Sequence, residues 1–235
     1  MAEEEGFEPS RPFGPAVFKT AAINHSATPP EGYENIIVRC REIWHIKRGT
    51  LFMTELHPDI ESVVLSESDI KTIVGNLGAE ISRDYAGLDP IIVCVLRGAF
   101  VYTADLLRAI TCPCTVDFMV ISSYGSDVKS SGHVRIRKDL DQDIRGRHVI
   151  IAEDILDTGL TLHRLKNLLQ TREPASIKVA AFSVKDIPGY QAPITADYVG
   201  CHVPNKFIVG YGLDYDEHYR NVPYIGVLKP EVYEK

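Results

Sequence analysis

One segment of the chain reads His148-Val-Ile-Ile-Ala-Glu-Asp-Ile-Leu-Asp-Thr-Gly-Leu-Thr161. Its β-branched run at residues 149–151 predicts a parallel strand that is covered on both faces. Glu153, Asp154 and Asp157 follow at the carboxyl end of that strand, which is where open α/β sheets bind their ligands. An apolar strand, then carboxylates, then a small hydroxyl-rich turn suggests a site for a phosphorylated sugar.

The turn Asp157-Thr-Gly-Leu-Thr161 is expected to open a helix, because leucines recur after it at helical spacing (Leu162, Leu165, Leu168 and Leu169). Backbone N–H groups, the positive helix end and two threonine hydroxyls would then converge where a phosphate could sit. Taken alone, an acidic pair after a strand can equally be a solvated turn or a helix cap. The chain has no Walker-type phosphate loop and no Gly-x-Gly-x-x-Gly motif.

Strand and helix patterns alternate along the chain. Ser66 is expected to cap a helix with an apolar face, and residues 99–110 form a second helical segment. Buried strands are predicted at 91–96, 116–121 and 177–184, and short strands at 198–202, 207–211 and 224–228. This alternation predicts an α/β fold with a mostly parallel, doubly wound sheet. The polar stretch from Ser122 to Arg137 is expected to be a mobile lid, with an inert surface loop as the alternative.

Composition narrows the class of protein. With 235 residues and 45% hydrophobic content, the chain is long enough for one α/β domain plus a tail. A net charge of -7 argues against a nucleic-acid surface, and no apolar run is long enough to span a membrane. Five cysteines, an odd number, favour a reducing, cytoplasmic location. Cys112 and Cys114 are expected to be ordinary thiols rather than half of a zinc site.

Residues 1–52 differ from the rest of the chain. They are rich in proline and glutamate and show no sustained helical or strand period. They lack the features of a secretory signal or a transit peptide. We expect a domain at residues 53–235, preceded at 1–52 by a disordered extension or by a mis-assigned start, in which case the native chain begins at Met53.

The chain resembles the phosphoribosyltransferases of the hypoxanthine-guanine type, most closely bacterial members, from about Asp59 to the C-terminus. The resemblance is carried by the segment quoted first and by Val95-Leu-Arg-Gly98, Ser122-Ser-Tyr-Gly125, Phe182-Ser-Val-Lys185, Asn205-Lys-Phe-Ile-Val-Gly-Tyr-Gly-Leu-Asp-Tyr215 and the ending Tyr219-Arg-Asn-Val-Pro-Tyr-Ile-Gly-Val-Leu-Lys-Pro-Glu-Val-Tyr233. It implies the type I phosphoribosyltransferase fold with a small hood. The implied reaction is purine salvage: the 5-phosphoribosyl group passes from 5-phosphoribosyl 1-diphosphate to N9 of hypoxanthine or guanine, giving IMP or GMP and diphosphate.

The resemblance also implies roles for individual residues. Asp157 matches the acid-base group near purine N7, which is compatible with capping the following helix. Residues matching the phosphoribosyl diphosphate site are Glu153, Asp154, Asp157, Thr158, Gly159, Leu160, Thr161, Leu96, Arg97, Gly98 and Arg220. Those matching the base site are Lys185, Phe207, Ile208 and Asp214; the lid residues are Ser123 and Tyr124. Mg2+ is the implied cofactor, near Glu153, Asp154 and Asp214, and the family implies a homodimer or homotetramer.

Some positions depart from the family pattern. Lys185 lacks its usual flanking residues, and Lys206 and Arg97 replace an acid and a lysine that are common in relatives. The changed surroundings of Lys185, with a connection to Tyr198 that is one residue longer than in bacterial relatives, blur the rim of the base pocket. The replacements at 206 and 97 remove no catalytic group. Two other functions stay open: an enzyme that accepts xanthine or a pyrimidine, and a non-catalytic nucleotide-sensing regulator with the same fold. Retention of Asp157, Lys185 and Phe207 together disfavours the regulator.

Overall fold

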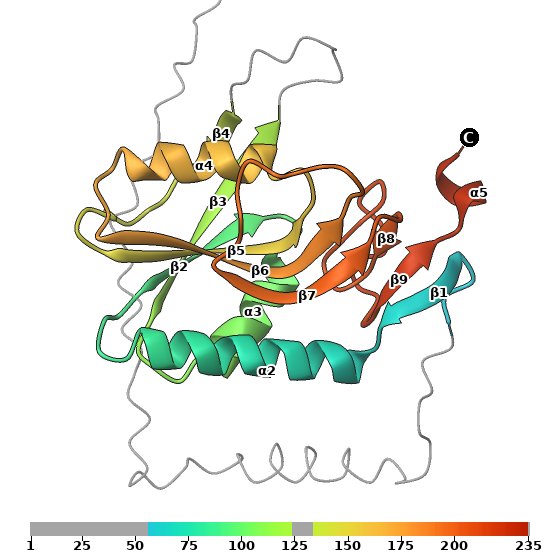
Figure 1. The fold of residues 1–235 in the computed structure, drawn as a ribbon, viewed down its shortest axis with the longest axis horizontal. Coiled ribbons are helices and arrows are strands. Elements are labelled where there is room, and N and C mark those ends of the chain that lie inside the picture. Colours follow the sequence, from blue (N-terminus) through green and yellow to red (C-terminus); the bar gives the residue numbers. More distant parts are fainter. Residues whose placement is uncertain (1–55, 124–133, 235) are drawn as a thin grey trace, which may run out of the picture. The chain divides into compact units, whose positions relative to one another are not determined.

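The structure is a computed structural model that describes residues 56–123 and 134–234. The expectations for residues 1–52 and for Tyr124 therefore lie outside the described residues. Within them the chain forms one large sheet with helices on both faces, and a second, small sheet (Figure 1).

The large sheet has six strands in the order β4-β3-β2-β5-β6-β7. Its strands are β2 (Ile91–Leu96), β3 (Thr115–Ser123), β4 (Val134–Lys138), β5 (His148–Leu156), β6 (Ser176–Asp186) and β7 (Tyr198–Pro204). All neighbouring pairs are parallel except that of the edge strand β4 with β3. The predicted mostly parallel, doubly wound sheet is thus confirmed.

Helices α2 (Glu67–Asp84) and α3 (Phe100–Ala109) cover one face of this sheet, and α4 (Leu160–Gln170) covers the other (Figure 1). Ser66 caps α2 in a capping box with Asp69, as its position before an apolar-periodic segment predicts. Alternate residues of one strand enter different cores: Ile92 packs with the α2 and α3 side, Ile91 with the α4 side. Burial on both faces explains why the central strands are apolar throughout.

A second sheet of order β1-β9-β8 forms the hood. It consists of β1 (Ile60–Leu65), β8 (Ile208–Val209) and β9 (Ile225–Leu228), which pair antiparallel, and is followed by the single-turn helix α5 (Pro230–Tyr233). The hood has its own small core, in which Ile60, Val209 and Leu228 are fully buried or nearly so. It places the segment from Phe207 to Arg220 beside the large sheet.

Two expected elements differ in the structure. Residues 134–137, assigned to the polar stretch, belong to β4, an edge strand that pairs with the end of β3. The strand predicted at 207–211 is shorter, because Gly210 and Gly212 adopt φ values of 100° and 101° that interrupt an extended chain. A Cβ atom at Gly210 would clash with the Tyr224 carbonyl, so close packing in the hood requires this turn.

The cysteines of the described residues, Cys94, Cys112, Cys114 and Cys201, are free thiols. Burial raises the pKa of the Cys114 thiol, and the neighbouring Cys112 adds to the effect. That residues 112 and 114 are ordinary thiols rather than zinc ligands stays a prediction. No helix of the described part of the chain is long and apolar enough to cross a bilayer.

Candidate active site

The site lies where β2 and β5 part. The two strands pair as far as Cys94 and Ala152, and beyond these residues β5 keeps only its β6 neighbour. After β2 the chain passes through α3 to β3, which lies on one side of the split. After β5 it passes through α4 to β6, which lies on the other side, so the split is the topological switch point of the sheet. Such a split at the carboxyl ends of parallel strands is where open α/β sheets bind ligands.

Three segments that are distant in sequence meet at this split. A Cβ atom at Gly98 would clash with the Asp154 carboxylate, and one at Gly212 would clash with the Gly98 carbonyl. The turn after β2 therefore lies between the end of β5 and the hood segment, and glycine is required at both contacts. The peptide bond between Leu96 and Arg97 in this turn is cis.

Glu153 and Asp154 form a partly buried pair of carboxylates. Burial raises the pKa of Glu153 well above its ordinary value, and the adjacent Asp154 charge adds to the shift. Burial likewise raises the pKa of Asp154 to about 6; its own backbone contacts and Arg220 oppose the shift, and Asp214 adds to it. Oε2 of Glu153 is buried without a hydrogen-bond partner among the described residues. Such an oxygen is suited to an added cation or donor, since a lone buried acceptor is costly.

These carboxylates fit a divalent cation that is also bound by phosphate oxygens. Mg2+ prefers oxygen ligands and usually takes one or two carboxylates, with waters and substrate phosphates completing its coordination. No group of three or more acidic, histidine or cysteine side chains within the described residues is arranged to hold a metal by itself. A cation held by Glu153 and Asp154 would thus need ligands from a bound phosphate. Asp214 is near enough to Asp154 to raise its pKa.

The turn from Asp157 to Thr161 leads into α4. Gly159 precedes the helix with φ of 71°, in the left-handed region, and no side chain caps the helix start. The first N–H groups of α4 are thus available to an anion. Asp157 does not cap this helix; its carboxylate faces Lys185 instead. Tyr190 donates a hydrogen bond to the Thr158 carbonyl over 3.0 Å.

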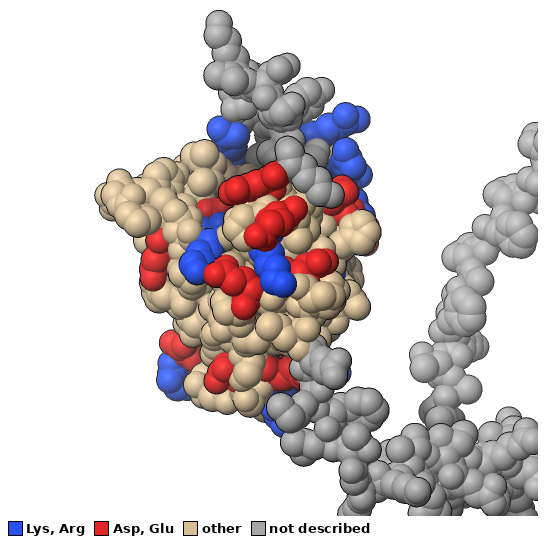
Figure 2. Space-filling model, turned by 90° about the vertical axis from the view of Figure 1, so that its right-hand side faces the viewer, with Lys and Arg blue, Asp and Glu red and all other residues tan. Residues whose placement is uncertain are grey.

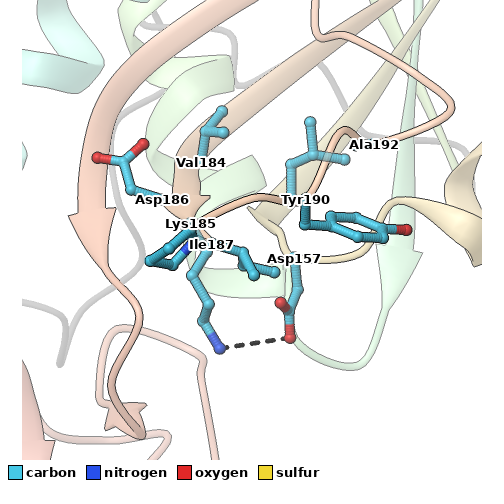
Figure 3. Close-up of a pocket in the computed structure, with 9 residues that line it drawn as sticks. Asp157, Val184, Lys185, Asp186, Ile187, Tyr190 and Ala192 are labelled. Carbon is cyan, nitrogen blue, oxygen red and sulfur yellow. Dashed lines mark hydrogen bonds and ion pairs between the residues drawn. The ribbon is translucent and has the colours of Figure 1, made fainter.

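Lys185 and Asp157 point toward each other from the end of β6 and the turn after β5 (Figure 3). Their Nζ and Oδ2 atoms are 3.3 Å apart, and the Lys185 side chain is 16% exposed. They border a cavity of about 290 Å³, which is lined by Asp154, Ile155, Asp157, Lys185, Phe207, Ile208, Leu213 and Asp214. The cavity combines an ammonium group, carboxylates, an aromatic ring and aliphatic walls, which suits a flat polar ring.

A chain of charges borders this cavity. Arg220 Nη2 lies 2.8 Å from Asp214 Oδ1 and 3.1 Å from Glu217 Oε2. Nη1 of Arg220 donates to the Gly212 carbonyl over 2.7 Å, and Arg97 Nη1 lies 3.0 Å from Glu217 Oε2. Figure 2 shows acidic and basic side chains next to one another on the face that carries the hood. The two arginines are thus held by carboxylates at positions from which they could contact a diphosphate.

The structure brings a group of the predicted site residues together. Six of them line the one cavity: Asp154, Asp157, Lys185, Phe207, Ile208 and Asp214. Arg97 is more exposed, at 65%, and joins the site through Glu217. Ser123 ends β3, and Tyr124 lies outside the described residues. Ile155 and Leu213 also line the cavity but were not predicted, although each is next to a predicted residue. Glu217 was not predicted either, although its spacing of three from Arg220 was a usable signal.

Known proteins resemble this chain over about three quarters of its length. The family described as "Phosphoribosyl transferase domain" matches residues 64–216. The hypoxanthine-guanine phosphoribosyltransferase of Streptococcus thermophilus is 49% identical over 180 residues, which are 77% of this chain and 99% of the relative. A crystal structure of a hypoxanthine phosphoribosyltransferase from Staphylococcus aureus superposes with a TM-score of 0.72 and 44% identity, covering 76% of this chain and 97% of that one. A hypoxanthine-guanine-xanthine phosphoribosyltransferase structure has a TM-score of 0.67 and 40% identity, with 74% and 99% covered.

Proposed function

The chain belongs to the phosphoribosyltransferase family, and from that premise we propose that it is a hypoxanthine-guanine phosphoribosyltransferase of purine salvage. It transfers the 5-phosphoribosyl group of 5-phosphoribosyl 1-diphosphate to N9 of hypoxanthine or guanine and releases diphosphate. The observation that carries the proposal is the cavity shared by Asp157, Lys185 and Phe207 beside the carboxylate pair and the start of α4. Each demand of the reaction has a residue group there.

The sugar phosphate is held at the split of the sheet. The uncapped N–H groups at the start of α4, with Thr158 and Thr161, bind the 5-phosphate, and Leu160 contributes main chain to this cradle. Glu153 and Asp154 bind the ribose hydroxyls. The turn from Leu96 to Gly98 and the guanidinium of Arg220 bind the diphosphate. Ser123 and Tyr124 are proposed to close over it and exclude water.

The base is held by groups from different elements. The Lys185 ammonium donates to the 6-oxo oxygen, the Phe207 ring stacks on the purine, and the main chain at Ile208 contacts the base edge. Asp157 accepts or returns the proton at N7 as N9 attacks C1 of the ribose. Since Lys185 Nζ and Asp157 Oδ2 are 3.3 Å apart, both groups can reach the adjacent O6 and N7 atoms of one purine.

Magnesium is the proposed cofactor, with Glu153, Asp154 and Asp214 as the carboxylates nearest to it. When bound, Mg2+ neutralises charge on the leaving diphosphate. Chelation with EDTA is therefore expected to abolish turnover, and added Mg2+ to restore it. We also propose that the protein is a homodimer or homotetramer and is located in the cytoplasm. Light scattering of the purified protein measures its oligomeric state.

The test is a nucleotide-formation assay with phosphoribosyl diphosphate, Mg2+ and hypoxanthine, guanine, xanthine, adenine or uracil. We expect turnover of hypoxanthine or guanine, and a loss of roughly 100-fold or more in Asp157→Asn. Asp186→Asn is the matched control, because Asp186 is a nearby carboxylate that does not line the base cavity. Turnover of xanthine would extend the proposed set of accepted bases beyond hypoxanthine and guanine. No turnover of any base, with nucleotide still bound, would favour the regulator.

A further inference from the structure

Three aromatic rings form a cluster at the edge of the base cavity. Tyr233 stacks on Phe207 with ring centroids 4.8 Å apart and planes inclined by 20°. Tyr215 meets the Phe207 ring edge-on, at 5.6 Å and 86°. Both are favourable arrangements of aromatic pairs, because an offset stack or an edge contact brings the positive ring edge near the negative face. Phe207 is therefore held from two directions by residues of the hood and the C-terminal helix.

Tyr233 and Asp157 border different cavities beside Phe207. Phe207 and Lys185 line both the cavity of about 290 Å³ and a neighbouring cavity of about 500 Å³. Tyr233 lines only the larger one, which contains neither Asp157 nor Asp154. The stacked tyrosine thus occupies the side of Phe207 that is turned away from the acid-base group, and the other side remains for a base.

The backbone holds Tyr233 in this place. Leu228 N donates to the Phe207 carbonyl over 2.9 Å, and Lys229 N donates to the Asp59 carbonyl over 2.9 Å. Pro230 then opens the single turn of α5, which carries Tyr233. Val232 and Tyr233 also pack against the hood core. The position of the Tyr233 ring is therefore set by two anchored residues and a helical turn.

Phe207 needs such support because its own surroundings are open. Its side chain is 38% exposed, and it follows a loop rather than lying within a strand. An unsupported ring would lose rotational freedom when a base stacks on it, and this loss would weaken binding. A ring that is already stacked on one face offers its other face in a fixed plane.

We propose that Tyr233 is a positioning residue of the base site, which acts by holding the Phe207 ring plane for the incoming purine. This inference rests on the proposed function. Its specific consequence is a selective effect on the base: Tyr233→Leu, which keeps apolar bulk but no planar ring, raises the KM for guanine about three- to tenfold. The KM for phosphoribosyl diphosphate and kcat stay near the wild-type values, because Tyr233 does not line the cavity that Asp157 borders.

The experiment compares wild type, Tyr233→Leu, Tyr233→Phe and Glu231→Ala in steady-state assays with both substrates, together with thermal unfolding. Tyr233→Phe keeps the ring and is expected to restore the wild-type KM for guanine. Glu231 is exposed on the same helical turn, so Glu231→Ala controls for changes to α5. A base-selective rise in Tyr233→Leu, rescued in Tyr233→Phe, supports the proposal.

Three results would overturn it. An unchanged KM for guanine in Tyr233→Leu shows that the stack does not matter. A lowered KM shows that Tyr233 competes with the base. Equal losses for both substrates, with a lowered melting temperature, show a role only in holding the hood. Failure of the proposed function is distinct, since the wild type itself would then show no turnover.

Discussion

At the scale of single residues, the pairing of Lys185 with Asp157 governs the chemistry of the base site. Each has the other as its charged partner at 3.3 Å, and Lys185 is mostly buried. The pair limits the cost of burying the ammonium group, and in the proposed function O6 and N7 of a purine replace this mutual contact. Removing either member leaves the other charge without a partner and removes one contact to the base.

Lys185→Met is predicted to lower kcat/KM for guanine about 10- to 100-fold, because a hydrogen bond to a charged donor contributes about 1.5–3 kcal/mol. Steady-state kinetics with guanine measure this. Lys206→Met is the matched control: Lys206 adjoins Phe207 but does not line the cavity with Asp157. Equal losses in the two variants would show a general charge effect instead of a contact to the base.

The buried carboxylate of Asp154 lowers the free energy of unfolding when it is ionised. Folded Asp154 keeps its proton up to a pH of about 6, whereas an unfolded aspartate releases it near 3.8. Between these values the folded state binds more protons than the unfolded state. The free energy of unfolding therefore falls as pH rises through this window, and the cost is fully present above it.

We predict that Asp154→Asn raises the free energy of unfolding by about 1–3 kcal/mol near neutral pH, that this gain fades as pH falls toward about 4, and that activity is lost. Urea unfolding of the wild type and the variant at several pH values, with EDTA present, measures the difference in the free energy of unfolding. Asp139→Asn should have the opposite sign, because the hydrogen bond from Arg172 holds the pKa of Asp139 below its usual value. The Asp139–Arg172 pair therefore stabilises the folded state above the usual aspartate pKa, and this stabilisation is lost as the pH falls through the lowered pKa of Asp139. A destabilised Asp154→Asn protein at neutral pH would contradict the argument.

At the scale of elements, the turn before α4 depends on its packing against the β6–β7 connection. Gly159 has a positive φ, and a Cβ atom there would lie 2.9 Å from Ile194 Cγ2 and 3.4 Å from Ala192 Cβ. Tyr190 of the same connection bonds the Thr158 carbonyl. The β6–β7 connection thus packs against the turn from Asp157 to Thr161 and supports it.

Gly159→Ala is predicted to lower the free energy of unfolding by roughly 2 kcal/mol or more, since it adds a clash to the backbone strain. It should also raise the KM for phosphoribosyl diphosphate. Gly146→Ala is the matched control, because Gly146 has φ of 67° with nothing within 4 Å of the added Cβ. That variant should show the strain of roughly 1 kcal/mol without a change in KM. Denaturant unfolding and steady-state kinetics measure both.

At the scale of the whole domain, residues near its beginning and its end hold the hood together. β1 pairs with β9, Tyr219 donates to Asp59 Oδ2 over 2.8 Å, and His57 N donates to the Tyr224 hydroxyl over 2.8 Å. These contacts join positions more than a hundred residues apart, and they fix the segment that carries Phe207 and Asp214. The base site therefore depends on residues close to position 57.

We predict that a chain beginning at Met53 keeps the melting temperature and the kcat/KM of the full chain. A chain beginning at Ser66 is the control, because it lacks β1 and the buried Ile60, whose burial stabilises by roughly 1.5–3 kcal/mol. That control should melt at a lower temperature and lose base binding. Loss of activity on removal of residues 1–52 alone would refute the proposed domain boundary.

Much of the fold could be predicted because its cues are local. The strand at 91–96 and the cap at Ser66 follow from β-branched runs and from a short acceptor before an apolar helical period. The edge strand β4 was missed because Val134-Arg-Ile-Arg-Lys138 was counted with the polar stretch before it, although its apolar and charged residues alternate as in a half-exposed strand. The early end of β8 was missed because it depends on Tyr224, a residue far along the chain.

By itself the sequence determined the elements, their alternation and the residue types of the site, because periodicity, capping and turn preferences act between near neighbours. Only the tertiary structure decided that β2 lies beside β5, that Lys185 meets Asp157 across 28 positions, and that Tyr233 backs Phe207. These contacts depend on which faces are buried together when distant segments pack, and no local pattern records the partner that a buried face will meet.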